Sequence, residues 1–370
     1  MLIVRILLIL ILVAAVLFLA LLPVMIRDGS RFVTREYVIS SDKISKEHTF
    51  VFISDLHEKV YEPDNEPIVR AVDRLHPEMV IVGGDMITGT HVNPGDPDAA
   101  WCRRALSLLE RIGEKYPIFL CNGNHELKLL DPDYAGRFGD AYGQYMRELQ
   151  KIGLRVRRNE SEELPGDPDV VLWSFEADHD KFDRFGDHNI DGAYVAERLP
   201  NPDPSKFNIV VTHHPRHFDA CAFWGADLVL AGHIHGGILR LPKVGGIVSP
   251  DPQLFPHYSG GRYEISFDAE GKVTGRSGRV FDSAKTPAVP QGGRKSVMVL
   301  SCGIGFHTIP IRIFNPAELS LIRLEPAGKR TIPDGEICLH ELIKANGIHT
   351  YQGAGLRGPD GPSPASHRHQ

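Results

Sequence analysis

Residues 226–237 read ADLVLAGHIHGG, an apolar run that ends in two histidines and a pair of glycines. In an extended strand residues i and i+2 face the same side, so His233 and His235 could converge on one site. Gly236 and Gly237 allow a sharp turn or a close approach of the backbone to a ligand. One interpretation of this stretch is a metal site, and the other is a polar turn at the end of a strand.

Short apolar runs that stop at polar residues recur along the chain. They are rich in Val, Ile and Phe, as in strands buried on both faces; the runs are TFVFIS (49–54), MVIVGG (79–84), PIFLCNG (117–123), FNIVVT (207–212) and ADLVLAG (226–232). Between them, EPIVRAVDRL (66–75) and AAWCRRALSLLERI (99–112) have apolar residues at helical spacing. The alternation predicts an α/β fold in which helices cover the sheets.

The pattern changes beyond residue 241. Residues 241–261 are rich in Pro and Gly and predict a long loop that could rim a site. Three side chains in this loop could contact acyl chains or pack in the core: Leu254, Phe255 and Tyr258. Residues 263–325 show few helical patterns and are expected to complete a second sheet, with strand candidates RYEISF (262–267), VMVLSC (297–302) and LSLIRL (319–324).

The N-terminus departs from an otherwise ordinary composition. The segment from Leu2 to Leu22 carries one charge, Arg5, and at about 1.5 Å per residue it would be about 31 Å long, close to one hydrocarbon core. A cleaved signal peptide is the alternative, but its apolar region is usually about 7–15 residues long and precedes a small-x-small site. Here the run is longer and no A-x-A sequence precedes Pro23. We therefore predict an uncleaved, single-pass membrane helix.

Basic residues favour one orientation of this helix. Arg27, Arg31 and Arg35 follow the apolar segment, whereas only Arg5 and the α-amine begin it. This count favours a main domain on the cytoplasmic face, and the opposite orientation is the alternative. The expected organisation is a membrane anchor over residues 1–24, a tether over 25–47, a main domain over 48–325 and a tail over 326–370 that is disordered from about residue 353.

Charge and cysteine content exclude several classes of protein. The 370 residues carry a formal net charge of -6, so no overall basic field attracts nucleic acid, and we expect no nucleic-acid partner. The five cysteines are odd in number and form no CxxC motif, which excludes a disulfide framework and a zinc ribbon. Free thiols favour a reducing compartment.

Residues that can bind metal ions follow each of the five predicted strands. Ligand sites in α/β sheets gather at the carboxyl ends of strands. A single Asp or His there is explained as a turn, a cap or a surface residue, but the repetition at successive strand ends indicates a shared site. The residues are Asp55 and His57, Asp85, Asn124 and His125, His213 and His214, and His233 and His235.

The residue types indicate the kind of metal. Asp and His with one Asn and no thiolate suit Mn, Fe or Zn, with Mn favoured. The ligands are too many for one tetrahedral ion and about enough for two ions that share a bridge. Two ions about 3.5–4 Å apart can clamp a phosphoryl group during an in-line displacement. A bridging ligand must be a centrally placed carboxylate, and Asp85 is the natural candidate.

Five motifs in this order resemble the calcineurin-like metallophosphoesterases: DLH (55–57), GGD (83–85), GNHE (123–126), HHP (213–215) and GHIHGG (232–237). The resemblance implies a four-layer α/β/β/α sandwich of two mixed sheets and hydrolysis of phosphoric esters or anhydrides. RLP (240–242) and GIG…PIRIFNPAEL (303–319), with the N-terminal anchor, resemble the bacterial membrane-associated branch. That branch includes enzymes that cleave the pyrophosphate of UDP-2,3-diacylglucosamine in lipid A synthesis.

The resemblance also implies a role for each motif residue. The first metal would be held by Asp55, His57 and His235. The second would be held by Asn124, His213 and His233, with Asp85 bridging the two. The family places its ligand two residues before the proline, which selects His213 over His214. His125 would contact the substrate phosphoryl group, as a stabiliser of charge or a proton donor to the leaving oxygen.

These roles predict a membrane-anchored dimetal phosphoesterase that acts on a phosphorylated small molecule or a lipid-linked substrate. An outward-facing cell-envelope phosphatase or nucleotidase and a non-catalytic metal-binding scaffold are the alternatives. Scaffold relatives usually lose ligands, whereas every ligand position is filled here. Two departures from the family pattern are Glu58, where an apolar or small residue is common, and Ile238, where the membrane branch commonly has Gln.

Overall fold

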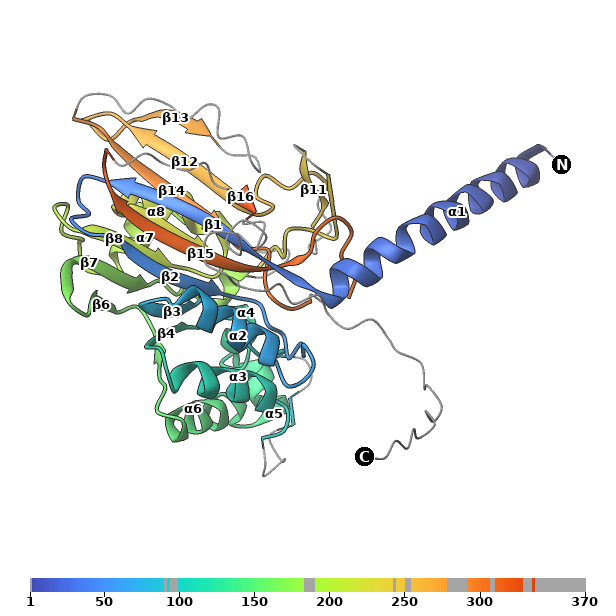
Figure 1. Ribbon diagram of the computed structural model, residues 1–370, viewed down its shortest axis with the longest axis horizontal. Helices are drawn as coiled ribbons and strands as arrows, with labels where there is room; N and C mark the ends of the chain where they lie inside the picture. The colour runs from blue at the N-terminus through green and yellow to red at the C-terminus, as the bar shows by residue number, and fades with distance from the viewer. Residues whose placement is uncertain are drawn as a thin grey trace, which may run out of the picture. The chain divides into compact units, whose positions relative to one another are not determined.

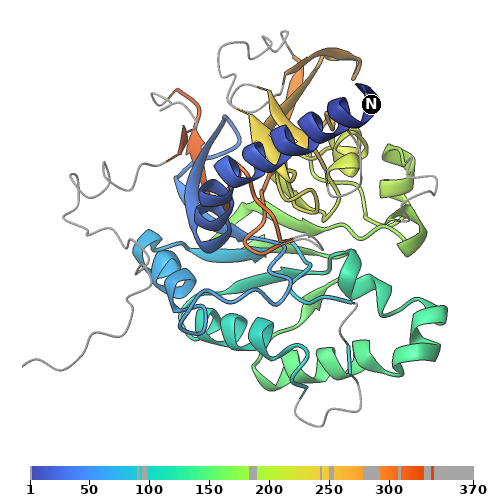
Figure 2. The same ribbon diagram turned by 90° about the vertical axis from the view of Figure 1, so that its right-hand side faces the viewer.

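The computed structural model describes residues 2–89, 92–93, 99–182, 190–241, 244–249, 254–277, 292–306, 310–328 and 335–336. Within these residues, two seven-stranded sheets face one another and helices cover their outer faces (Figures 1 and 2). Each sheet contains both parallel and antiparallel pairs. The predicted α/β fold with four layers and two mixed sheets is therefore confirmed.

The first sheet contains the first three predicted strands as parallel neighbours: β2 (His48–Ile53), β3 (Met79–Val82) and β4 (Ile118–Cys121). Its full order is β16-β1-β15-β2-β3-β4-β5. The other strands are β1 (Phe32–Ser41), β5 (Val156–Arg157), β15 (Ala317–Pro326) and β16 (Gly335–Glu336).

The second sheet contains the other two predicted strands, β8 (Phe207–Val211) and β9 (Leu228–Ala231), which are also parallel neighbours. Its order is β13-β12-β14-β9-β8-β7-β6. The remaining strands are β6 (Ser161–Leu164), β7 (Asp167–Ser174), β12 (Gly261–Phe267), β13 (Val273–Ser277) and β14 (Arg294–Leu300). A separate hairpin pairs β10 (Leu239–Leu241) with β11 (Gly245–Val248).

The main core lies between the two sheets. Alternate residues of the central strands enter it, for example Phe50 and Phe52 of β2 and Ile209 and Val211 of β8. The intervening residues face the outer helices and are equally buried, as Val51 shows. Burial on both faces explains why these strands are continuous apolar runs instead of alternating ones.

Helices with one apolar face cover the first sheet. They include the two predicted helices, α2 (Glu66–Leu75) and α3 (Arg103–Gly113), which bury residues at helical spacing such as Leu108 and Ile112. The short helices α4 (Asn124–Lys128) and α5 (Pro132–Phe138) and the longer α6 (Ala141–Lys151) follow β4. The second sheet is covered by α7 (Gly192–Ala196) and α8 (Phe218–Trp224).

The sequence-based assignment of residues 25–47 as a tether is wrong. Residues up to Ser30 belong to α1 (Leu2–Ser30), and β1 then forms a parallel ladder with β15 inside the first sheet. Five residues of β1 are buried, among them the apolar Tyr37, Val38 and Ile39. Strand β1 was not predicted because Thr34, Arg35 and Glu36 interrupt its apolar residues. In the folded protein, polar partners compensate for these side chains.

The C-terminal strands also differ from expectation. β12 and β14 join the second sheet as predicted, but β15 crosses to the first sheet and pairs with β1 and β2. Strand propensity indicates that a segment forms a strand but not which strand it pairs with. It therefore offered no reason to place β15 in a different sheet from β14. The expected disordered tail from residue 353 lies outside the described residues.

Helix α1 is long and apolar enough to cross a membrane, and none of its most apolar stretch is buried. A signal sequence near an N-terminus can also be this long and apolar. The helix extends six residues beyond the predicted anchor and ends beside the sheets, where Asp28 is buried. The helix therefore has two parts, a long exposed apolar stretch and a C-terminal end that packs against the rest of the protein.

We predict that the buried ion pair between Arg35 of β1 and Glu318 of β15 is the strongest polar link between these strands. Glu318→Gln should lower the free energy of unfolding by about 3 kcal/mol, because an uncompensated guanidinium stays buried. Urea denaturation of the full chain in detergent, followed by tryptophan fluorescence, measures this. Glu36→Gln, which breaks the more exposed pair with Arg323 across the same two strands, should cost less than about 1 kcal/mol. Equal losses in the two variants would contradict the prediction.

Candidate metal centre

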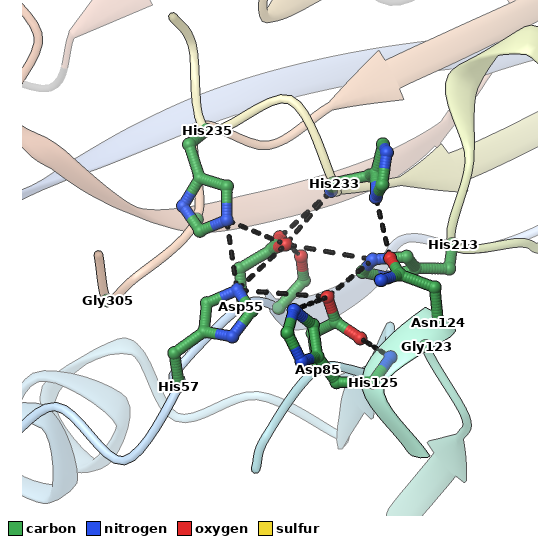
Figure 3. A network of polar contacts seen from close by, with 12 residues as sticks. Asp55, His57, Asp85, Gly123, Asn124, His125, His213, His233, His235 and Gly305 are labelled. Atoms are coloured by element: carbon green, nitrogen blue, oxygen red, sulfur yellow. Dashed lines mark hydrogen bonds and ion pairs between the residues drawn. The ribbon is translucent and has the colours of Figure 1, made fainter. Parts of the chain in front are cut away.

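The two sheets bring all five strand ends with polar residues to one place (Figure 3). Asp55 and Asp85 follow the neighbouring strands β2 and β3, and Asn124 begins α4 directly after β4. His213 follows β8, and His233 and His235 follow β9. The carboxyl ends of parallel neighbours meet at the same sheet edge, so each sheet contributes one half of the site.

One group of side chains gathers around Asp55. His235 Nε2 lies 3.3 Å from Asp55 Oδ1, and His57 Nε2 lies 3.8 Å from the same oxygen. His57 Nε2 and His235 Nε2 are 3.0 Å apart. One ligand atom from each of these three residues lies within 4.8 Å of the others, which is close enough to hold one metal ion.

A second group gathers around Asp85. His213 Nε2 lies 3.0 Å from Asp85 Oδ2, and His233 completes a set of three with mutual ligand distances within 4.8 Å. Asn124 Oδ1 lies 2.7 Å from His233 Nδ1, at the edge of this set. Asp85 Oδ2 is also 3.7 Å from His57 Nε2, so this carboxylate lies between the two groups.

The hydrogen bonds around His213 fit a metal ligand. Its Nδ1 lies 2.8 Å from the carbonyl oxygen of Gly83, so a neutral ring places its proton on Nδ1. Nε2 then presents a lone pair toward the Asp85 carboxylate, and among the described residues it has no hydrogen-bond partner. Two facing groups with lone pairs repel one another unless a cation or a proton lies between them.

The charges of the site fit divalent ions as well. Burial lowers the pKa of His213, but the Asp85 and Asp55 carboxylates raise it more, to about 10. Burial raises the pKa of Asp55, yet His235 and His57 reverse the shift and hold it well below the usual range. The buried carboxylates thus demand positive charge, which a pair of metal ions can supply in place of protons.

The ligand residues have unusual backbone conformations. Five of the seven predicted ligands have positive φ angles: Asp55 59°, His57 47°, Asp85 53°, His233 75° and His235 52°. Non-glycine residues seldom adopt this region, and Asp, Asn and His tolerate it best. The prediction that His233 and His235 share one face of a strand is therefore wrong, because both lie in a turn after β9. That turn directs His235 toward His57 and His233 toward Asn124.

Two glycines allow the loops of the first sheet to touch. A Cβ on Gly84 would lie 2.1 Å from the backbone nitrogen of Gly123, and a Cβ on Gly123 would lie 2.2 Å from Asp85 Oδ1. A side chain at Gly84 would force the two loops apart, and one at Gly123 would displace Asp85. The backbone nitrogen of His125 donates to Asp85 Oδ1 over 2.8 Å, and this bond orients the carboxylate.

The sequence pattern indicated no role for Glu126, yet its carboxylate organises this part of the site. Its carboxylate accepts from the backbone nitrogens of Asp85, Met86 and Gly123, each at 2.8 Å. Burial and Asp85 raise the pKa of Glu126 to about 7, while these amides favour the ionised form. Its place in GNHE, next to His125, was the available signal, but a buried carboxylate that binds only backbone has no distinctive sequence pattern.

Arg312 and Asn315 were also missed as organisers of the centre. The buried Arg312 guanidinium donates to the carbonyl oxygens of Gly305 and His235. Asn315 Nδ2 donates to the carbonyl oxygens of His235 and Gly237, over 2.7 and 2.6 Å. The segment PIRIFNP (310–316), whose sequence indicated only a family resemblance, thus fixes the loop that carries His235.

His125 and His214 lie next to ligand residues but make different contacts. The backbone nitrogen of Gly89 donates to His125 Nδ1 over 2.9 Å, and His125 Nε2 lies 4.0 Å from Asp85 Oδ2. The His214 ring instead packs against His233 at a tilt of 33°, with ring centroids 4.3 Å apart, and its Nδ1 accepts from the backbone nitrogen of Arg216. His125 therefore faces the centre, whereas His214 supports it from behind.

The remaining residues singled out from the sequence lie outside the centre. The backbone nitrogen of Glu58 donates to the carbonyl oxygen of Met86, and burial raises the pKa of the Glu58 carboxyl to about 8. Ile238 takes part in a backbone bond to Val248. Arg240 is buried against the carbonyl oxygens of Ser259 and Gly260.

Comparison with known proteins gives the family. A family model described as calcineurin-like phosphoesterase matches residues 48–237, just over half of the chain. The chain belongs to the calcineurin-like phosphoesterase family. It is therefore a metal-dependent hydrolase of phosphoric esters, and the ligand sets around Asp55 and Asp85 lie within or at the edge of the matched region.

Individual relatives are distant. The chain is 27% identical to YpbG, an uncharacterised protein of Bacillus subtilis, over 59% of this chain and 72% of that protein. It is 25% identical to an uncharacterised metallophosphoesterase of Campylobacter jejuni, over 76% of this chain and 60% of that protein. A dimetal phosphatase structure from Danio rerio is 13% identical and covers 51% of this chain and 82% of its own, with a TM-score of 0.29.

We predict that Glu126→Gln weakens the centre without removing a ligand. The amide nitrogen of Gln would face backbone N–H donors, which should lower the free energy of unfolding by about 1–3 kcal/mol and metal affinity by about 10–100-fold. Isothermal titration with Mn²⁺ and urea denaturation measure these effects. Glu148→Gln on the surface of α6, which loses only a pair with Lys151, is the matched control. Unchanged Mn²⁺ affinity in Glu126→Gln would refute the proposed function of this carboxylate.

Proposed function

We propose that this protein is a membrane-anchored, two-metal phosphoesterase that hydrolyses a phosphodiester or pyrophosphate bond in a lipid-linked or nucleotide-sugar-lipid substrate. The observation that carries the proposal is that the ligand sets around Asp55 and Asp85 lie next to one another, with Asp85 Oδ2 only 3.7 Å from His57 Nε2 of the other set. A site with two neighbouring ligand sets suits a phosphoryl group, whose charge is spread over several oxygens.

The proposed ligand roles follow the two groups. Asp55, His57 and His235 would hold the first ion. Asn124, His213 and His233 would hold the second, and the Asp85 carboxylate would contribute to both. Divalent ions held there, with Mn favoured over Fe or Zn, would neutralise the phosphoryl charge and acidify a water molecule.

His125 is the proposed catalytic residue. Because its Nδ1 accepts a hydrogen bond from the Gly89 amide, the neutral ring carries its proton on Nε2. Nε2 faces Asp85 and the centre, where it can donate to a phosphoryl oxygen or to the oxygen of the leaving group. The backbone bond thus selects the tautomer that proton donation requires.

The membrane part of the proposal rests on α1 and on the resemblance of PIRIFNP and RLP to the membrane-associated branch. An anchored site meets lipid substrates in two dimensions. The predicted cytoplasmic orientation now depends on fewer charges, because Arg35 is buried against Glu318 and does not flank the membrane. Arg27 and Arg31 still follow the apolar segment.

A matched pair of histidine variants tests the metal assignment. We expect His213→Ala to bind fewer than two Mn²⁺ per chain and to lose at least about 100-fold in hydrolysis of an aryl phosphodiester. His214→Ala should keep both ions, because the His214 ring packs against His233 and belongs to none of the ligand sets found among the described residues. The measurements are metal content by mass spectrometry and turnover of the full chain after chelation and Mn²⁺ reconstitution. Two ions with no turnover in the wild type would favour the scaffold alternative.

Protease accessibility tests the orientation. We expect the domain to resist external protease in intact cells and to be cleaved after the inner membrane is permeabilised, because Arg27 and Arg31 would stay on the cytoplasmic side. Immunoblotting against the domain reads the result, and a periplasmic protein serves as the control for outer-membrane permeability. Cleavage in cells whose inner membrane is intact would favour the outward-facing phosphatase or nucleotidase.

A further inference from the structure

Exposed apolar side chains gather in one region of the protein. Outside α1, seven large apolar side chains of the described residues are well exposed, and two of them, Leu130 and Phe223, lie on other parts of the surface. The other five belong to the β10–β11 hairpin and the segments paired with it. We call these five residues the apolar face: Leu241, Val244, Leu254, Phe255 and Phe314.

Backbone pairing joins the segments that carry the apolar face. Residue Leu254 forms an isolated bridge with Val248 of β11, and the Phe255 nitrogen donates to the carbonyl oxygen of Ile247 over 2.8 Å. On the other side, Ile313 exchanges backbone bonds with Ile238 and Arg240 over 3.0 Å. These segments form one connected backbone unit, which we call the platform: the β10–β11 hairpin with residues 254–255 and 313–314. The platform carries all five side chains.

The platform holds two aromatic residues outward in strained conformations. Phe255 and Phe314 both have φ angles of 53°, a region that bulky residues rarely adopt. Their side chains remain 60% and 46% exposed, so within the described part of the chain they gain little burial in return. Tyr258 in the same loop packs against the core of the second sheet instead. Strain that leaves an aromatic ring in solvent indicates contact with something else.

The platform is continuous with the end of α1. The backbone nitrogen of Asn315, the residue after Phe314, donates to Asp28 Oδ2 over 3.1 Å. Figures 1 and 2 show that α1 leaves the sheets on the side that carries the β10–β11 hairpin. Arg27 and Arg31, exposed at the same end of the helix, have the position and charge of residues at a headgroup layer.

The metal centre lies close to this end of α1. Lys59, two residues after His57, donates to the carbonyl oxygen of Gly29 over 3.1 Å. On the other side of the centre, the chain passes from His235 through Gly237 directly into β10. The ligand loops and the apolar platform are therefore parts of the same local structure.

We propose that the apolar face inserts into the leaflet that contains the C-terminal end of α1 and holds the metal centre at the level of the lipid headgroups. The substrate class is then a phosphoric ester or anhydride whose phosphorus lies at the headgroup layer of a lipid. The inference rests on the proposed function, because it requires α1 to span a bilayer. A bilayer is chosen as the occupant because the platform adjoins an apolar helix and basic residues.

Membrane depth can be measured without any enzymatic activity. The full chain with Cys338→Ser is placed in nanodiscs of phosphatidylcholine and phosphatidylglycerol, and an environment-sensitive fluorophore is attached at Phe255→Cys or Phe314→Cys. Phe223→Cys, an exposed aromatic position on α8, is the matched control, and Leu17→Cys within α1 is the positive control. The four cysteines among the described residues are buried, which limits background labelling.

Nitroxide-labelled lipids should quench the fluorophores at 255 and 314 and leave that at 223 bright. Quenching at 17 without quenching at 255 and 314 would overturn the inference, and cross-linking of 255 between chains would then assign the apolar face to a second protein copy. An unquenched fluorophore at 17 would overturn both the inference and the anchor.

Hydrolysis gives a second, separable readout. Leu254→Glu with Phe255→Glu should lose turnover of a fluorogenic phosphodiester lipid in the nanodisc and keep turnover of a soluble aryl phosphodiester; Phe223→Glu should keep both. Equal turnover of the lipid by the double variant and the wild type would overturn the inference. Quenching at 255 and 314 in a protein that hydrolyses neither substrate would leave the membrane contact standing and refute the proposed function.

Discussion

The carboxylates of Asp55 and Asp85 are buried where the two sheets meet, so nearby positive charge must compensate for them. The arrangement of the surrounding residues depends on this compensation. Histidines approach both, and among the described residues neither carboxylate faces a lysine or arginine across an ion pair. Buried anions that are paired only with imidazoles are stable when the imidazoles are protonated or when a cation is bound. This requirement explains why ligands from five strand ends come together at one place.

Holding that arrangement requires strain, and the surrounding loops are built to maintain it. Most of the ligands have positive φ angles, and the loops that carry them are linked backbone to backbone. Glu126 joins the Asp85 loop to the Gly123 loop through three amides, while Arg312 and Asn315 fix the His235 loop through carbonyl oxygens. A preorganised site of this kind loses little free energy on reorganisation when charge develops in a transition state.

The same loops connect the centre to the N-terminal helix. Asn315 binds the His235 loop through its side chain and Asp28 through its backbone, so one residue joins a proposed ligand loop to the end of α1. Burial of Asp28 and of β1 makes the segment after the apolar helix part of the folded domain. The distance between the proposed membrane surface and the centre is therefore set by packing and not by a flexible linker.

The order of strands and ligands was readable from sequence, because strands buried on both faces are apolar throughout and each ends at a residue that binds metals. These signals extend over only a few residues, so they do not show how segments that are distant in sequence come together. The motif resemblance already predicted that Asp55, Asp85 and the histidines share a site and divide between two groups, but only the tertiary structure shows the turn after β9 that directs His233 and His235 to different partners. It alone places β1 and β15 in the first sheet, since pairing depends on partners distant in sequence. Glu126, Arg312 and Asn315 bind backbone atoms of other loops. Such contacts have no sequence pattern, because the loops meet only in the folded chain.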